Sequence, residues 1–165
     1  MKQLIGSFAF LFIASPVYAS WVYEGQKSDF GGAGQHFALN LSADQNYSFG
    51  FRCLDDSAQA VFITPEVLEI ADLEGISRIS VTLLLKVDSG EAIDLDATVD
   101  SAQKLLRVTA ESVSKEQLEL VQNATKSVSV ALRIGEKVIH ETRFNARGST
   151  TAISKFMEGC GITGN

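Results

Sequence analysis

From Gln35 onward, apolar and polar residues mostly alternate, a pattern typical of β-strands with one buried face. In YSFGFRC (residues 47–53), alternation places the aromatic residues and Cys53 on one side and Arg52 on the other. The same pattern predicts further strands at LLRVTAE (105–111) and SVSVALRI (127–134), with FALNL (37–41) and AVFI (60–63) as additional candidates.

The clearest predicted pair of strands is a β-hairpin over residues 78–99. RISVTLLLKV (78–87) and AIDLDATV (92–99) both carry an aliphatic residue at every second position. Between them lies the link Asp88-Ser89-Gly90, in which Gly90 can take the left-handed conformation that closes a hairpin with a bulge.

KVIHETRF (137–144) has a mixed pattern, because apolar residues fall on both sides. We expect an edge or partly covered strand here. One side would carry Val138, His140, Thr142 and Phe144, and the other Lys137, Ile139, Glu141 and Arg143.

TPEVLEIADLEG (64–75) is compatible with two structures. Thr64 as N-cap and Pro65 at the first helical position favour a helical turn. Leu68 and Ile70 would equally well alternate in a strand, so both alternatives stay open.

Two helices are predicted with clear ends. SKEQLELVQNA (114–124) begins with a capping box, Ser114 and Gln117, and would bury Leu118 and Val121. Near the C-terminus, Ser149 or Thr150 can cap a second helix that Gly159 and Gly161 end. Its apolar stripe at i, i+3, i+4 and i+7 consists of Ile153, Phe156, Met157 and Cys160.

The chain has two cysteines, and both lie on predicted apolar faces. The simplest arrangement packs the C-terminal helix against the sheet with Cys160 over Cys53, forming one disulfide. Two free thiols or an intermolecular bridge remain the alternatives. The predicted fold is thus mainly β: an antiparallel β sandwich or barrel-like sheet of about seven or eight strands, with a short capping-box helix and a docked C-terminal helix.

Residues 1–19 have the features of a cleaved secretory signal peptide. Lys2 precedes an apolar run over residues 4–14, and Val17-Tyr18-Ala19 places small residues at the cleavage site. The run is shorter than the roughly 20 residues of a spanning helix, so we expect no stable membrane insertion after cleavage. Residues 20–165 would then form a single periplasmic or secreted domain, with Trp21 folding back as an anchor.

The charge of the predicted mature chain is acidic. Without Lys2, 13 basic residues stand against 20 acidic ones, a net charge of −7. Nucleic-acid binding depends on clustered Lys and Arg, so we expect no nucleic-acid partner. A cationic partner would suit this charge, although solubility alone also explains it.

Candidate catalytic and metal-binding motifs are weak, and we expect no cofactor, metal site or catalytic residue. Gly31 to Gly34 precede a strand rather than a helix, which favours a turn over a phosphate-binding loop. His36 and His140 are the only histidines, too few for zinc if both cysteines form a disulfide. The carboxylate pairs Asp94/Asp96 and Asp55/Asp56 fit an outer strand face and a turn.

The order of several segments resembles a known group of proteins. These segments are FGFRC, DDSAQAVFIT, VTLLLKVDSGEAI, VSVALRI, TRFNARGSTTAISKF and a closing CG. Over residues 21–161 they are similar in order and spacing to the VasI-like type VI secretion accessory proteins, and more loosely to invasion-associated locus B-like periplasmic domains. The resemblance implies a β-rich periplasmic domain with a Cys53–Cys160 bridge. The family's closing Cys-Gly-Trp is replaced here by Cys160-Gly161-Ile162.

The expected function is that of a non-enzymatic periplasmic accessory or protein-binding domain, whose sheet face or edge binds another envelope protein. An acidic inhibitor or immunity protein against a cationic cell-wall hydrolase is the alternative, and a small envelope hydrolase is the third. Arg52 would form an exposed ion pair with a carboxylate or contact a partner. The other candidate partner-binding residues are Lys137, Ile139, Glu141 and Arg143.

Overall fold

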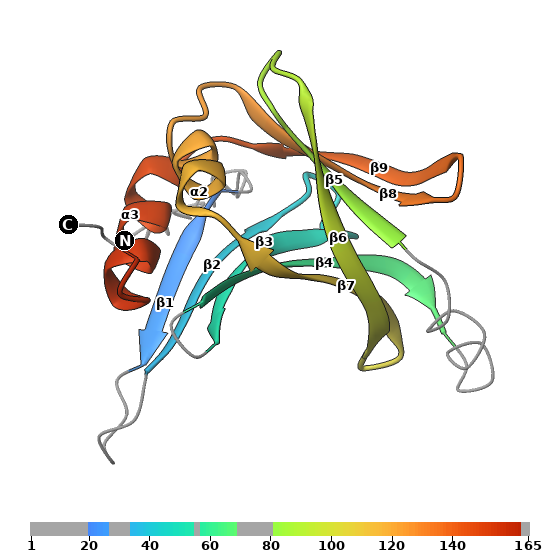
Figure 1. Cartoon of the computed structure of the whole chain (residues 1–165), viewed down its shortest axis with the longest axis horizontal. Helices are drawn as coiled ribbons and strands as arrows, with labels where there is room; N and C mark the ends of the chain where they lie inside the picture. Colours follow the sequence, from blue (N-terminus) through green and yellow to red (C-terminus); the bar gives the residue numbers. More distant parts are fainter. Residues whose placement is uncertain (1–19, 27–33, 55–56, 69–80, 163–165) are drawn as a thin grey trace, which may run out of the picture.

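The computed structural model describes residues 20–26, 34–54, 57–68 and 81–162 of the chain. These residues form one antiparallel sheet with two helices beside it, so the prediction of a mainly β fold is confirmed (Figure 1). The strands are β1 (Val22–Gln26), β2 (Gln35–Leu41), β3 (Ser48–Leu54), β4 (Ser57–Val67), β5 (Val81–Val87), β6 (Ala92–Ala102), β7 (Leu105–Val113), β8 (Ser127–Ile134) and β9 (Lys137–Asn145). The helices are α2 (Lys115–Gln122) and α3 (Ser149–Gly159).

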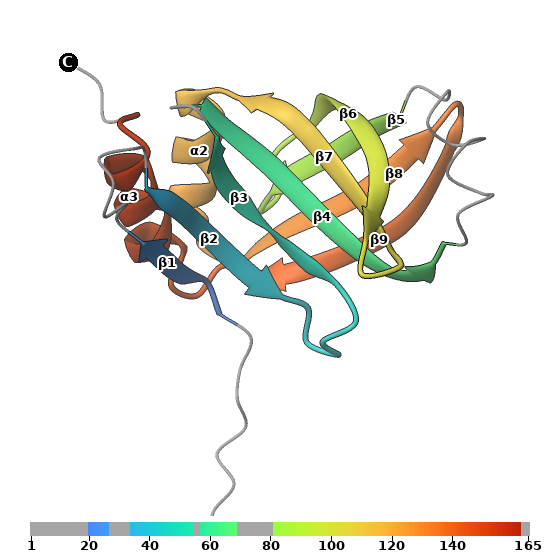
Figure 2. The same ribbon diagram turned by 90° about the horizontal axis from the view of Figure 1, so that it is seen from below.

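The sheet has the strand order β1-β2-β3-β4-β7-β6-β5-β8-β9 and curls strongly, so that β8 and β9 lie across β3 and β4 (Figure 2). The terminal strand β9 also contacts β2, which lies near the other end of this strand order. The side-chain amide of Asn40 in β2 donates to the carbonyl oxygen of Asn145 at the end of β9, 2.7 Å away. This contact links β9 to the other half of the sheet, which has a barrel-like shape.

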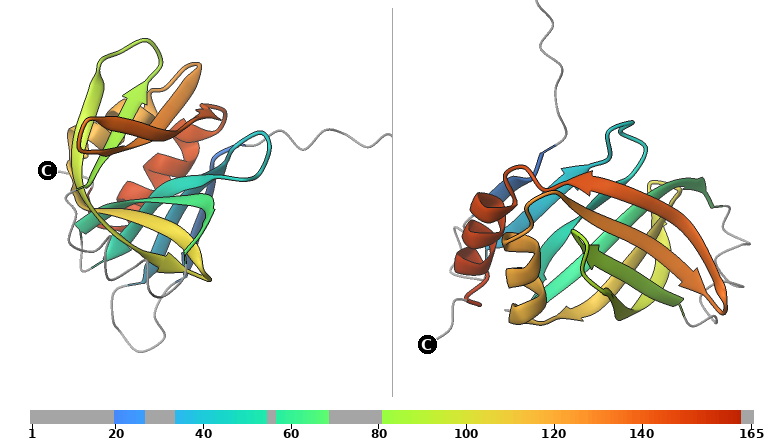
Figure 3. Two further views of the ribbon diagram at one scale, coloured as in Figure 1. Left: turned by 90° about the vertical axis from the view of Figure 1, so that its right-hand side faces the viewer. Right: turned by 90° about the horizontal axis from the view of Figure 1, so that it is seen from above.

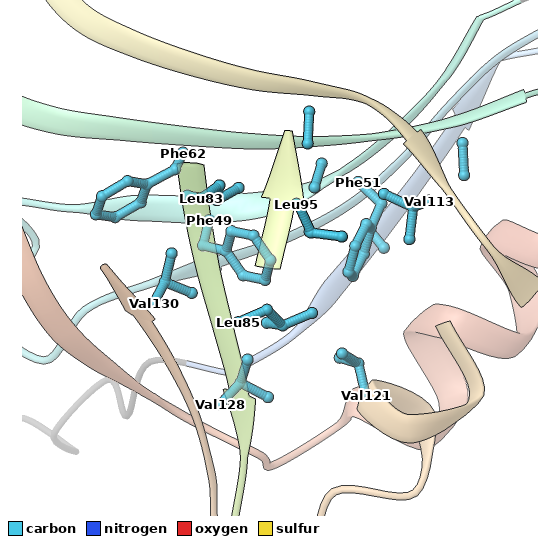
Figure 4. Close-up of a cluster of buried hydrophobic side chains, with 14 of the residues drawn as sticks. Phe49, Phe51, Phe62, Leu83, Leu85, Leu95, Val113, Val121, Val128 and Val130 are labelled. Atoms are coloured by element: carbon cyan, nitrogen blue, oxygen red, sulfur yellow. The ribbon is translucent and has the colours of Figure 1, made fainter. Parts of the chain in front are cut away.

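Aromatic and aliphatic side chains fill the space inside the curled sheet (Figure 4). Phe49 and Phe51 of β3 are fully buried, as their alternation predicts. Phe144 of β9 packs on Phe49 and on Phe62, with ring centroids 5.8 and 6.5 Å apart. These contacts join the two halves of the sheet in one core, which is the main source of its stability.

β1 is a strand that the sequence pattern did not reveal. It has five residues, of which only Tyr23 is partly buried, so no alternation marks it. Trp21 just before it is buried, stacks on Phe51 and meets Phe49 edge-on, with centroid distances of 6.0 and 5.9 Å. The backbone N–H of Trp21 also donates to the carbonyl of Arg147. Its predicted role as an anchor is therefore confirmed.

The predicted hairpin is confirmed from Val81 onward as β5 and β6, whereas residues 78–80 lie outside the described part. A different residue closes its turn. Asp88 has the positive φ of 52°, whereas we expected Gly90 to be left-handed. The Asp88 carboxylate accepts hydrogen bonds from the backbone N–H groups of Thr125, Lys126 and Ser127. These contacts with a distant segment stabilise a conformation that aspartate tolerates better than most residues.

The ambiguous segment 64–75 is a strand in its described part, because β4 continues through Val67. Its ladder with β7 is irregular between Ile63 and Val67, which accommodates Pro65 at a position where proline cannot donate a hydrogen bond. Residues 69–75 lie outside the described residues, as do Gly31 to Ala33, Asp55, Asp56 and the predicted signal peptide.

β9 is a terminal strand, as predicted, but it changes face halfway along. Val130 pairs with Thr142 and Leu132 with Ile139, so β9 has one residue more than β8 at this point. His140 occupies this β-bulge with a φ of 52°. Because paired residues share a face, Ile139 lies on the core side with Leu132, and Val138 lies outside. The expectation that Val138 shares a face with Phe144 is therefore wrong, and the bulge explains the mixed pattern.

Helix α2 has the predicted capping box. The Gln117 backbone N–H donates to the Ser114 hydroxyl, and the Ser114 backbone N–H donates to the Gln117 side chain. Leu118 and Val121 are buried, as expected. α2 lies beside α3, and both helices pack at one end of the curled sheet (Figure 3).

Helix α3 begins differently from the prediction. Its N-cap is Gly148, with a left-handed φ of 82° and no side-chain cap. The hydroxyls of Ser149 and Thr150 instead donate to the Gln122 carbonyl at the end of α2, so a tertiary contact replaces the expected local cap. Its end agrees with the prediction, because Gly161 is left-handed and its N–H donates to the Glu158 carbonyl.

A disulfide joins Cys53 in β3 to Cys160 at the end of α3, with their Cα atoms 5.6 Å apart. The predicted intramolecular bridge is confirmed. Ile153, Phe156 and Met157 are buried with Cys160, so the stripe predicted from helical spacing faces the sheet. In the described part of the chain, neither helix is long and apolar enough to span a membrane.

Candidate functional site

Arg52 lies on the outer face of β3, and in the described part of the chain it bonds an amide rather than a carboxylate. Its Nε donates to Oε1 of Gln59 in β4, 2.6 Å away. Nε2 of Gln59 in turn donates to the carboxylate of Glu111 in β7. The expected direct ion pair is replaced by a chain of three side chains with a neutral amide in the middle.

The four candidate residues of β9 do not form one surface. The bulge at His140 places Lys137 and Ile139 on the core side of the strand, near its exposed tip, while Arg143 lies outside with its partner Ser129. All four are exposed, but they lie on β9 and not beside Arg52. The structure therefore does not bring the five predicted partner-binding residues together.

His140 of β9 contacts two residues that are distant in the sequence, Glu66 in β4 and Tyr47 just before β3. Its Nε2 lies 2.7 Å from Oε2 of Glu66 in β4. The hydroxyl of Tyr47, just before β3, lies 3.5 Å from its Nδ1. Tyr47 in turn stacks on Phe62. Sequence reasoning considered His140 only as a metal ligand, since nothing local indicates partners 74 and 93 residues away.

A second surface carries exposed aliphatic residues on the outer face of β1 and β2. We call Val22, Leu39 and Leu41 the outer apolar strip. Their exposed fractions are 53%, 41% and 47%. Val22 and Leu39 are direct cross-strand partners, and Leu41 follows two residues later on the same face. Three large aliphatic side chains thus lie together in solvent.

The outer apolar strip arises because β2 turns its large apolar side chains toward solvent and its small or polar ones toward the core. Its large apolar residues Phe37, Leu39 and Leu41 face outward, while the inward positions hold Ala38 and Asn40. Asn40 can be buried because its amide donates to the Asn145 carbonyl. Hydrophobicity alone would place the large residues of FALNL in the core, so this surface is a feature that the sequence analysis missed.

The strip continues across the sheet without a charged side chain. Gly50 of β3 pairs with Leu39, and a Cβ there would lie 2.7 Å from the Leu39 side chain and 2.2 Å from the Ala38 carbonyl oxygen. Gly50 thus lets Leu39 lie flat over β3. The complete uncharged row, one residue per strand from β1 to β6, is Val22, Leu39, Gly50, Val61, Thr109 and Thr98.

Charged groups, most of them acidic, flank this row. On one side lie Glu24 and Glu111 with Arg52 between them, and Asp44 lies in the turn that follows Leu41. Hydrogen bonds from the Ser42 hydroxyl and from Asn46 lower the pKa of Asp44, which therefore keeps its negative charge. On the other side, Arg107 and Asp100 neutralise each other in an ion pair.

A hollow of about 360 Å³ adjoins the strip near Gln26, the last residue of β1. Among the described residues it is lined by Glu24, Gly25, Gln26, Gln35 and Phe37. One carboxylate, two side-chain amides and an aromatic ring are groups that suit the side chain of a lysine or arginine.

The outer face of β5, β6 and β8 differs from that of β1 and β2. Asp94 of β6 pairs there with Arg133 of β8, so the candidate carboxylate pair Asp94/Asp96 is partly engaged in an ion pair. Within the residues that the structure describes, no three His, Cys, Asp or Glu side chains gather in a way that could hold a metal ion.

Comparison with known proteins supplies no relative for this chain. No protein-family model, no curated protein and no solved structure matches it.

Proposed function

We propose that residues 20–165 form a non-enzymatic exported accessory domain that binds another envelope protein through the outer apolar strip. The observation that carries this proposal is the inverted strand β2, which exposes Leu39 and Leu41 and buries Asn40. Scattered apolar residues on a surface need no explanation, but a contiguous patch rimmed by polar groups is typical of an interaction site.

The free energy available from burying the outer apolar strip is sufficient for a specific contact with a partner. Burial of one aliphatic side chain contributes about 1.5 to 3 kcal/mol when it is fully removed from water. Val22, Leu39 and Leu41 are each about half exposed, so part of this free energy remains available for binding. The flat row over Gly50 allows close approach of a second apolar surface.

The partner that fits best is a protein with an apolar patch bordered by lysine or arginine side chains. Glu24, Asp44 and Glu111 outnumber the one cation on this border, Arg52, whose Nε already donates to Gln59. The predicted mature chain has 20 acidic against 13 basic residues. The hollow beside Phe37 would receive one of the partner's basic side chains. Opposite charge at the rim speeds association and excludes wrong partners.

The free edge of β9 is the weaker candidate for this contact. A β-bulge and exposed charged side chains such as Lys137 and Arg143 are features that discourage addition of a further strand. The hydrogen bond between Asn40 and Asn145 also occupies one end of the strand. The sheet face, and not this edge, is therefore the surface we assign to the partner.

Export supports the same proposal. A disulfide such as that between Cys53 and Cys160 forms and persists in an oxidising compartment such as the periplasm. Cell fractionation and N-terminal mass analysis test this part: we expect a periplasmic protein that begins at Ser20. A cytoplasmic protein that retains Met1 would contradict it.

The binding test uses the substitution Leu39→Lys with Leu120→Lys as its matched control. Leu120 is a similarly exposed leucine on α2, away from the strip. Tagged wild-type and variant proteins are incubated with envelope extract, and the retained proteins are identified. We expect wild type and Leu120→Lys to retain the same partner, and Leu39→Lys to lose about tenfold in affinity, equivalent to roughly 1.4 kcal/mol.

Four results would contradict the proposal. Equal retention by Leu39→Lys would show that the strip is not the contact, and complete elution by salt would favour the acidic inhibitor. A dimer in sedimentation that Leu39→Lys abolishes would make a second copy the occupant. Turnover of peptidoglycan by the purified protein would support the small hydrolase.

The role in type VI secretion is a narrower proposal within this one, and it rests on the resemblance in segment order. If it is correct, the retained partner is a component of that secretion system. Recovery of an unrelated envelope protein with Leu39-dependent binding would leave the docking function in place and remove the secretion role.

A further inference from the structure

A second row of side chains runs beside the uncharged row, on the same outer face of the sheet. Glu24 of β1, Phe37 of β2, Arg52 of β3 and Gln59 of β4 are successive cross-strand partners, and Gln59 contacts Glu111 of β7. We call these five residues the charged row. Because this row borders the outer apolar strip, the inference rests on the proposed docking function and deepens it.

The cation of the charged row, Arg52, is held in place by a buried amide. Its Nε donates to Oε1 of Gln59, 2.6 Å away, and Nε2 of Gln59 donates to the Glu111 carboxylate. Gln59 lies on the outer face of the sheet, yet only 2% of it is exposed. A buried amide that is bonded at both ends has one favoured orientation, so Gln59 fixes the guanidinium from one side.

The guanidinium of Arg52 keeps most of its donors for a second partner. The hydrogen bond to Gln59 uses the Nε–H group, while the other N–H groups of an arginine lie on its two Nη atoms. Arg52 is only half-buried, so this end of the side chain is accessible from solvent. A carboxylate can accept two parallel hydrogen bonds from a guanidinium, and such charged pairs are roughly twice as strong as neutral hydrogen bonds.

Phe37 separates Arg52 from the acidic group nearest to it on the other side. Glu24 and Arg52 are both cross-strand partners of Phe37, so the aromatic ring lies between the two charges. In the part of the chain that the structure describes, Glu24 and Arg52 form no ion pair with each other. Each of them is therefore available to an opposite charge on a partner.

We propose that Arg52 binds a carboxylate of the partner protein, and that the partner therefore presents an aspartate or glutamate as well as a basic side chain beside its apolar patch. The basic side chain enters the hollow lined by Glu24 and Phe37. Neighbouring strands lie about 4.8 Å apart, so the backbones of Glu24 and Arg52, two strands apart, are separated by roughly 10 Å. The two charges of the partner should have a similar spacing.

A single cation within an acidic border makes the surface selective. A partner that offers only lysine and arginine is attracted by Glu24 and Glu111 but repelled at Arg52, whereas a partner with a carboxylate at this point is attracted at all three positions. The two kinds of partner predict opposite effects of removing Arg52. Binding of a purely basic partner would become tighter, and binding of a partner with the matching carboxylate would become weaker.

The experiment uses random peptides displayed on phage as the probe. They are selected on immobilised wild-type protein after depletion on Leu39→Lys, and we expect the retained peptides to combine apolar residues with at least one basic and one acidic residue. The best-binding peptide is then synthesised with its acidic residue and with the corresponding amide. Calorimetry measures the affinity of both peptides for wild type, Arg52→Met and Arg133→Met. Arg133 is the control, because it pairs with Asp94 on the outer face of β8.

The expected result is a pattern that only a direct pair produces. The amide peptide should bind wild type on the order of tenfold more weakly than the acidic peptide, and Arg52→Met should bind the acidic peptide more weakly by a similar factor. The two changes together should cost no more than either alone, because they remove the same interaction. Arg133→Met should bind both peptides as wild type does.

Other results separate this inference from the docking function. Tighter binding by Arg52→Met, additive effects of the two changes, or selected peptides without an acidic residue would overturn the role of Arg52 and leave the docking function in place. If no peptide prefers wild type over Leu39→Lys, the docking function falls and the inference falls with it. The amide peptide tests the carboxylate on wild-type protein, so the decision does not depend on the folding of a variant.

Discussion

The two terminal strands of the sheet, β1 and β9, are held in place by different kinds of contact. β1 follows the buried Trp21 and packs against α3, and α3 is joined to β3 by the Cys53–Cys160 disulfide. β9 has no covalent link nearby among the described residues. It is held by Phe144 in the core, by the bond between Asn145 and Asn40, and by the contacts of His140 with Glu66 and Tyr47.

The comparison indicates which edge of the sheet is fastened more firmly. Both edges carry a contact between a histidine and a tyrosine, His36 with Tyr23 beside β1 and His140 with Tyr47 beside β9. The difference that remains is the covalent link beside β1. We therefore expect the edge at β9, which in the described residues depends on core packing and hydrogen bonds alone, to have the lower local stability.

The largest expected effect comes from breaking the covalent link on the β1 side with Cys53→Ser and Cys160→Ser together. The bridge closes a loop with a sequence separation of 107 residues. In the chain-entropy model its removal lowers the free energy of unfolding by about 4 to 5 kcal/mol. Urea unfolding of the double variant and of oxidised wild type measures this difference.

Hydrogen exchange on the same double variant sharpens the comparison. Protection should fall more in α3 and β1 than in β9, because the lost link fastens α3. A uniform loss over both edges would show that the disulfide acts on the whole unfolded chain without local consequences. Wild type in reductant serves as the control for the substitutions themselves.

The second effect concerns the core contact of β9. Phe144→Ala removes a fully buried ring that packs on Phe49 and Phe62, and we expect a loss of about 3 to 5 kcal/mol. Val138→Ala on the same strand is the control, since Val138 is largely exposed and its substitution should change stability by less than about 0.5 kcal/mol. Similar losses in both variants would contradict the assignment of faces across the bulge.

A smaller effect is expected from the cap of α2. Ser114→Ala leaves the Gln117 N–H without its side-chain acceptor and should reduce stability by about 1 kcal/mol. Because α2 receives hydrogen bonds from Ser149 and Thr150, some loss of protection should extend to α3. Thermal unfolding measures the loss, with Ser89→Ala in an exposed turn as the control. If both substitutions have the same effect, the capping box does not stabilise this helix.

The smallest expected loss of stability is that of Asp88→Asn. This loss can be recognised because it should depend on pH. Backbone hydrogen bonds from Ser127, Thr125 and Lys126 hold the pKa of Asp88 well below its usual range. A carboxylate whose pKa is lower in the folded state contributes stability above about pH 4, and the contribution is lost as the pH falls. Asparagine tolerates the same left-handed backbone, so the substitution mainly removes the charge.

Urea midpoints of wild type and Asp88→Asn at a series of pH values test this expectation. The variant should be less stable at neutral pH, and the difference should shrink below about pH 4 as the wild-type carboxyl group gains its proton. A difference that stays constant across this range would mean that geometry, and not charge, connects Asp88 to residues 125–127.

Much of the fold follows from local patterns in the sequence. The alternation in residues 47–53 correctly predicted that Phe49 and Phe51 face the core, because burial selects one side of a strand. The capping box at Ser114 was predictable because its two members are three residues apart. The cap of α3 was not, since Ser149 and Thr150 bond a carbonyl of another helix.

The candidate site was predicted less well than the fold. Alternation placed Lys137, Ile139, Glu141 and Arg143 on one surface, but one extra residue at His140 divides them. Nothing in the local pattern marks the position of a bulge, which depends on the register with β8. The outer apolar strip was missed for a related reason, because the side of β2 that faces outward depends on its neighbours.

The sequence by itself determined which residues alternate, where α2 begins, and that two cysteines lie on apolar faces, since these features involve residues a few positions apart. Only the tertiary structure decided that β2 turns its leucines outward, that β9 changes face, and that His140 meets Glu66. These outcomes depend on contacts such as that of Asn40 with Asn145, which are 105 residues apart. A local pattern cannot encode such a contact, because it forms only when the whole sheet curls.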